Sequence, residues 1–61
     1  MYNLIKERVE SQYIVENFVD FVENGNSCYV RFTTESGMHL VEYRKLAKVF
    51  HFYKLERSET L

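Results

Sequence analysis

Residues 13 to 24 show the apolar spacing of an amphipathic helix. At about 100° per residue, six apolar side chains fall within an arc of about 160°; they are Ile14, Val15, Phe18, Val19, Phe21 and Val22. Strand alternation fails here, because each face would mix Phe or Val with Glu, Asp or Asn. The pattern predicts a helix that ends at Asn24-Gly25. The alternative is a hairpin with its turn at Asn24-Gly25.

A second apolar stripe lies upstream and consists of Tyr2, Ile5, Val9 and Tyr13, spaced three and four residues apart. Either one helix runs from residue 2 to 23, or the helix breaks near Ser11, a residue type that caps helices. Because this stripe is rotated away from the first, it needs a packing partner of its own. We therefore take it as a candidate dimer interface, with an edge of the sheet as the alternative.

The middle of the chain has the alternation of a half-buried strand. Cys28, Val30 and Phe32 are apolar at every second position, and the residues between them are mostly polar. Met38–Tyr43 is the predicted returning strand, after a turn that contains Gly37. A lone hairpin is marginally stable in water, so a helix is expected to cover its apolar face.

The last segment combines a helical stripe with strand-forming residues. The stripe consists of Leu46, Val49, Phe50 and Tyr53, and the preceding residues 44–48 have good helix-forming composition. Residues 49–53, in contrast, are rich in strand formers. We predict an α+β fold with the order helix, β-hairpin, helix (α-β-β-α). An α-β-β-β meander is the alternative, and the choice for residues 48–55 stays open.

With 61 residues, the chain is predicted to form one small domain over residues 1–61, with 57–61 frayed. The predicted core consists of Phe18, Val22, Val30, Phe32, Leu40, Leu46 and Phe50. Small domains usually need a disulfide, a metal or a partner chain. Cys28 is the only cysteine, and its spacing to His39 and His51 matches no zinc site. Self-association is the remaining support, so we predict a homodimer.

A lone cysteine fits a reducing compartment, and the longest apolar run is too short to span a bilayer. The N-terminal residues also lack the basic-then-apolar order of a signal peptide. We therefore expect a cytoplasmic protein that does not contact a membrane.

Charge is distributed unevenly along the chain. Residues 1–26 carry two basic and five acidic side chains, a net charge of −3, and residues 27–61 carry six basic and four acidic side chains, a net charge of +2. On the predicted C-terminal helix, Arg44, Lys48 and His51 share one face. The candidate contacts for a partner or for nucleic acid are Arg44, Lys45, Lys48, His51 and Lys54. The overall charge of −1 argues against strong phosphate binding.

Residues 19 to 49 resemble LytTR-type DNA-binding domains. The similar stretches are Val19–Glu23, Tyr29–Thr34 and Tyr43–Leu46, and the span that they define covers about half the chain. We take from this resemblance only the order strand, glycine-containing turn, strand and helix. In its general type, a short aromatic-rich chain without a catalytic motif, the protein also resembles small early proteins of bacteriophages. Many of those proteins bind and inhibit one host protein.

Candidate catalytic residues are scarce. Cys28 is expected to be buried, and Ser27, Thr34 and Ser36 are turn residues without a His or Asp at an informative spacing. We predict no enzyme activity, cofactor, metal or small-molecule substrate. The expected function is a homodimeric protein-binding module that modulates or inhibits a cellular protein. The alternative is a DNA- or RNA-binding regulatory module that uses the basic C-terminal segment.

Overall fold

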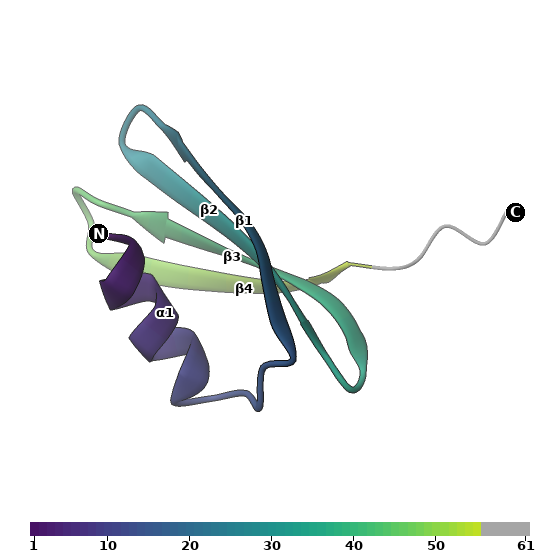
Figure 1. The fold of residues 1–61 in the computed structure, drawn as a ribbon. Helices are drawn as coiled ribbons and strands as arrows, with labels where there is room; N and C mark the ends of the chain where they lie inside the picture. Colours follow the sequence, from purple (N-terminus) through teal and green to yellow (C-terminus); the bar gives the residue numbers. More distant parts are fainter. Residues whose placement is uncertain (56–61) are drawn as a thin grey trace, which may run out of the picture.

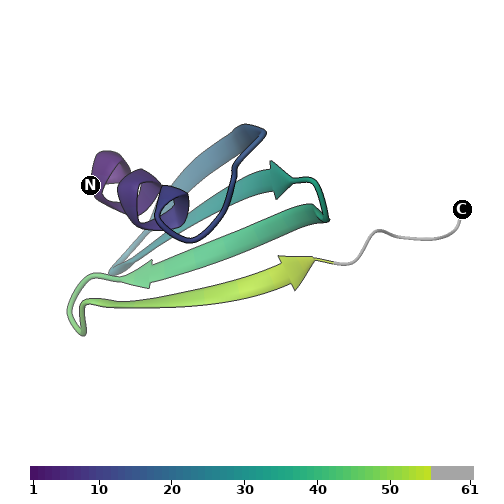
Figure 2. The same ribbon diagram turned by 90° about the horizontal axis from the view of Figure 1, so that it is seen from below.

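A computed structural model describes residues 1–55 as one short helix and a four-stranded antiparallel meander. The elements are α1 (Tyr2–Glu10), β1 (Asn17–Asn24), β2 (Ser27–Thr34), β3 (Gly37–Arg44) and β4 (Val49–Leu55). Each strand pairs with its neighbour in sequence, and α1 lies on one face of the sheet (Figures 1 and 2). The predicted fraying of residues 57–61 lies outside the described residues.

Helix α1 ends near Ser11, where the sequence predicted a possible break in the helix. Ser11 occupies its C-terminal cap, and the Ser11 hydroxyl donates a 2.6 Å hydrogen bond to the Arg8 carbonyl. The single long helix from residue 2 to 23 is therefore wrong. Ser11 closes α1 instead of starting a second helix. No helix in residues 1–55 is long and apolar enough to cross a membrane.

The predicted helix over residues 13–24 is also wrong, because residues 17–24 form strand β1. The pairing of β1 with β2 shifts between Phe18 and Asp20, so Val19 is an extra, bulged residue. The shift places Phe18 opposite Phe32 and Phe21 opposite Val30, on the same face of the sheet. A spacing of three residues on one face is what a helix would show, and it hid the strand alternation.

Strands β1 and β2 are joined by a hairpin turn at Asn24-Gly25, which was the alternative to a helix over residues 13–24. Asn24 pairs with Ser27, so Gly25 and Asn26 are the two central residues of the turn. Gly25 has φ +62°. Positive φ at the first central position of a two-residue hairpin favours glycine.

The predicted strands around Cys28–Thr33 and Met38–Tyr43 are confirmed as β2 and β3. The predicted C-terminal helix is wrong, because Val49–Leu55 forms strand β4, paired with β3. Residues 45–48 form a tight turn in which the Lys48 amide donates to the Arg44 carbonyl at 2.7 Å. Lys48 has φ +58°, a conformation that its residue type does not signal. The fold is thus mainly β rather than α+β.

The core lies between α1 and the sheet. Its buried apolar residues are Ile5, Val9, Cys28, Val30, Phe32, Val41 and Tyr43. Burial raises the pKa of the Cys28 thiol above its ordinary value. Sequence reasoning placed Val30 and Phe32 correctly.

The other five predicted core residues differ from that expectation. Phe18 and Phe50 are half-buried at the edge of the core, while Leu40 is half-buried on the face opposite α1. Val22 and Leu46 are 51% and 80% exposed, so their assignment to the core is wrong. The physical reason is that both assignments relied on helices that are strands or turns.

Candidate functional site

The face of the sheet opposite α1 combines aromatic, apolar and charged side chains. Because side chains alternate along each strand, the face is defined by the register of the four strands. We call it the open face; its central residues are Asp20, Val22, Tyr29, Arg31, Leu40, Glu42, His51 and Tyr53. No described element covers this face.

Glu42 lies at the centre of the open face and is only 7% exposed. The hydroxyls of Tyr29 and Tyr53 donate to its two carboxylate oxygens at 3.5 and 3.4 Å, and Arg44 Nε donates at 3.2 Å. The two hydroxyl contacts are longer than ordinary O–H···O bonds. The carboxylate is therefore shielded by neighbouring rings and paired with Arg44, while its two hydroxyl contacts are long, so it can accept a further donor from a bound partner.

A second charged group lies beside Glu42 on the same face. Arg31 Nε donates to both carboxylate oxygens of Asp20, at 3.0 and 3.2 Å. This hydrogen bonding lowers the pKa of Asp20 below its ordinary value. The pair borders an open groove of about 370 Å³, whose other lining residues are Val22, Tyr29 and Leu40. The groove thus offers apolar walls with a fixed ion pair at its side.

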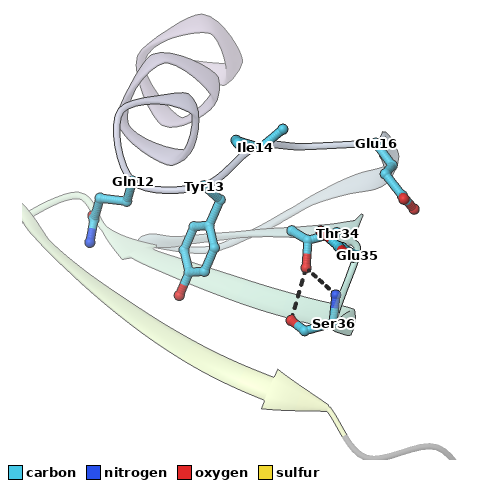
Figure 3. A pocket seen from close by; sticks show the side chains of 7 residues that line it. All are labelled: Gln12, Tyr13, Ile14, Glu16, Thr34, Glu35 and Ser36. Carbon is cyan, nitrogen blue, oxygen red and sulfur yellow. Dashed lines mark hydrogen bonds between the residues drawn. The ribbon is translucent and has the colours of Figure 1, made fainter.

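A larger hollow of about 700 Å³ lies at the other side of the molecule, between the linker after α1 and the β2–β3 turn (Figure 3). The linker contributes Gln12, Tyr13, Ile14 and Glu16, and the turn contributes Thr34, Glu35 and Ser36. The Thr34 hydroxyl accepts the Ser36 amide at 3.1 Å and lies 3.1 Å from the Ser36 hydroxyl. These bonds close the turn.

His39 lies behind this turn and is 6% exposed. Its Nε2 is 3.0 Å from the Thr34 hydroxyl and 3.3 Å from the Ser36 hydroxyl. Burial, assisted by the charge of Lys54, lowers the pKa of His39 below its ordinary value. A hydroxyl beside a neutral imidazole is the start of a nucleophile–base pair. Here the imidazole stacks on Phe32 with 5.1 Å between ring centroids, and we assign the cluster a structural role in the turn.

The predicted dimer stripe packs inside the chain. Ile5 and Val9 are fully buried between α1 and the sheet. Tyr2 contacts Phe18 and Phe21 of β1, and Tyr13 contacts Phe32, His39 and Phe52 across the next three strands. The stripe thus holds α1 and the first part of the following linker on the sheet.

The five predicted contact residues are spread over both faces of the sheet. Arg44 and His51 lie on the open face, and Lys45 and Lys48 lie in the β3–β4 turn. Lys54 lies on the helix side, opposite His39. Lys45 forms an ion pair with Glu23. The shared helical face that grouped these residues does not exist, because the segment is a turn followed by a strand.

The sequence analysis did not identify the centre of the open face. The alternation in Met38–Tyr43, which places Leu40 and Glu42 on the same side of the strand, would have been sufficient to find these two residues. Tyr53 was not accessible in this way, because its position beside Glu42 depends on strand β4.

The chain matches no family model, no curated protein and no solved structure. The resemblance to LytTR-type domains also fails in its last element, since Arg44–Leu46 enters a turn and not a helix. The function therefore has to be inferred from the geometry of this chain.

Within residues 1–55, no three His, Cys, Asp or Glu side chains gather in the manner of metal ligands.

Proposed function

We propose that this protein is a small non-enzymatic module of the cytoplasm that binds another protein through its open face and modulates it. The observation that carries the proposal is the shielded Glu42 carboxylate with its long hydroxyl contacts, in the middle of an otherwise uncovered aromatic and apolar surface. Tyr and Arg are residue types that dominate binding energy at protein interfaces. Tyr53, whose hydroxyl contacts the carboxylate, and Val22, which pairs with Tyr29 on the same face, are about half exposed, at 47% and 51%.

The charges of the open face favour a protein over a nucleic acid. Arg31 is paired with Asp20, and Arg44 donates to Glu42, so neither guanidinium is free of a carboxylate. Binding to a nucleic-acid backbone requires cations that face phosphates, and a carboxylate at the centre of the surface opposes it. The nucleic-acid alternative would have to rely on the β3–β4 turn, where Lys45 is paired with Glu23.

The proposal is tested by capture from a bacterial lysate with matched surface variants. Tyr29→Ala and Leu40→Ser each remove apolar surface from the open face. Leu46→Ser is the control, because Leu46 is 80% exposed in the β3–β4 turn and lies off this face. Thermal melting of each variant establishes that it is folded. Washes with nuclease and with raised salt remove partners held through phosphates.

We expect one protein partner that the parent and Leu46→Ser retain through both washes and that the two open-face variants lose. Retention by Tyr29→Ala and Leu40→Ser would place the binding surface elsewhere. Recovery of nuclease-sensitive material alone would support the nucleic-acid alternative instead, and recovery of no partner at all would count against binding of a cellular protein.

A further inference from the structure

Strand β4 forms an edge of the sheet that lacks the usual protection against pairing. Within residues 1–55 it pairs only with β3, over all seven of its residues and with a regular register (Figure 2). It contains no proline, and β-branched or aromatic residues make up most of it. An edge of this kind presents unpaired backbone donors and acceptors to another strand.

The opposite edge of the sheet is different. Strand β1 carries the bulge at Val19, which interrupts its register and discourages further pairing. Charged side chains can also protect an edge, and β4 has one lysine. The side-chain carbon Cε of Lys54 lies 3.9 Å from the position that a Cβ of Gly37 would occupy. Lys54 therefore leans across β3, away from the free edge.

We propose that two copies of this chain associate through their β4 strands, antiparallel and around a two-fold axis at Phe52. Only a register centred on Phe52 pairs all seven residues of both strands, since Val49 then lies opposite Leu55 of the second copy. In this register Phe50 faces Lys54 and His51 faces Tyr53. No two lysines oppose each other, and like charges directly opposite destabilise a strand pair.

The pairing also accounts for aromatic side chains that the single chain leaves half-buried. Phe50 and Phe52 pack only partly against the core, although Arg8 lies 4.8 Å from the Phe50 ring centroid. A symmetric strand pair places Phe52 against its own copy. The product is one continuous sheet of eight strands, twice the four of a single chain, with both α1 helices on one side. The predicted homodimer is thereby assigned to a sheet edge and not to the buried stripe of α1.

The first measurement is the mass of the unaltered protein by light scattering at micromolar concentration. We expect about twice the chain mass of 7.4 kDa. A mass of 7.4 kDa over the whole concentration range would overturn the proposal. The measurement does not involve the open face, so its outcome is independent of the proposed function.

The second measurement places the contact by disulfide trapping. His51→Cys and Tyr53→Cys are suitable because His51 is exposed and Tyr53 is 47% exposed, so both replacements leave the core intact. In an equimolar mixture, the two new thiols face each other across the two-fold axis. We expect a crosslinked dimer that forms several-fold faster in the mixture than in either variant alone.

Val49→Cys is the matched control on the same strand. In the proposed register its two copies lie at opposite ends of the paired strands, about 20 Å apart at 3.3 Å per residue. Cys28 is fully buried and contributes no crosslink. A dimer by mass whose mixture crosslinks no faster than Val49→Cys would show that the two copies meet elsewhere.

Discussion

His39 is a buried histidine whose ring packs among aromatic side chains. It stacks on Phe32, and the Tyr13 ring centroid lies 5.0 Å away. Burial is the main reason that its pKa lies below the ordinary value of 6.5, and the nearby charge of Lys54 acts in the same direction. The folded protein therefore keeps this imidazole neutral under conditions in which the unfolded chain already binds a proton.

The pKa of His39 predicts a loss of stability in weak acid. Because the unfolded chain binds more protons, the free energy of unfolding is highest above the unfolded pKa of about 6.5 and falls as the pH drops below it. The decrease continues until the lower folded pKa is reached. Urea unfolding at about pH 7.5 and about pH 5.5 should show this loss for the parent protein. In His39→Gln, which keeps a polar side chain without this titration, the difference should shrink; an equal loss would assign the effect to other groups.

Gly25 and Lys48 both have positive φ in turns, but only Gly25 is of a residue type that adopts this conformation without strain. Gly25 has φ +62° and open space around it, so Gly25→Ala meets no clash and only the backbone strain, about 1–2 kcal/mol. Lys48 has φ +58°, so Lys48→Gly relieves a strain of that kind and loses about 0.5–1 kcal/mol through chain entropy. We expect a lower melting temperature for Gly25→Ala and an equal or higher one for Lys48→Gly. A lower value for both would show that the Lys48 side chain stabilises its turn.

At the scale of elements, the bulge at Val19 determines which side chains β1 gives to the core. Phe18 and Phe21 face α1 together only because one extra residue lies between two otherwise regular halves of the strand. Tyr2 contacts both rings, with centroids at 6.3 and 5.2 Å. The bulge thus positions the two phenylalanine rings against which the N-terminal end of α1 packs.

Deletion of Val19 tests this role. Without the extra residue, Phe18 and Phe21 lie two positions apart in a regular strand, so both still face the core opposite Phe32 and Val30. We therefore expect the deletion to lower the free energy of unfolding by less than about 1.5 kcal/mol. Val19→Ala is the control, because Val19 is 45% exposed and its truncation keeps the register. Circular dichroism melting curves of the deletion and the control should lie close together; a loss of about 3 kcal/mol or more in the deletion, typical when a large aromatic side chain is removed from a core, would contradict this account.

The same elements show how far the sequence predicts the fold. Strands β2 and β3 were predictable, because their alternation is unbroken and their turn contains Gly37. Strand β1 was not, since its bulge imitates helical spacing. Strand β4 was predicted only as the alternative to a helix, because Lys48 adopts positive φ without being Gly or Asn and no residue type marks the β3–β4 turn. The open face was predictable to the same extent. The position of Leu40 on this face follows from local alternation, whereas the position of Tyr53 depends on the pairing of β4 with β3.

At the scale of the whole molecule, stability depends on a thin core around Phe32. Phe32 is fully buried and has the rings of Tyr13, Phe18 and His39 as neighbours. Phe32→Ala should cost about 3–5 kcal/mol, a large part of the roughly 5–15 kcal/mol of a typical domain. Leu46→Ala should change stability by less than about 0.5 kcal/mol, because Leu46 is 80% exposed. Urea titrations of the two variants compare these values; similar losses would place Leu46 in the core after all.

The burial of Cys28 gives this protein an internal reporter of its own opening. The thiol is fully enclosed between α1 and the sheet, and its raised pKa disfavours the reactive thiolate. A thiol-specific reagent can therefore modify the folded chain only during excursions that lift the helix from the sheet or separate the strands. When reclosing is faster than modification, the labelling rate reports the population of the opened form, and each 1.4 kcal/mol of lost stability speeds labelling about tenfold. The only cysteine of the chain can thus measure how often the core is exposed to solvent, without any added probe.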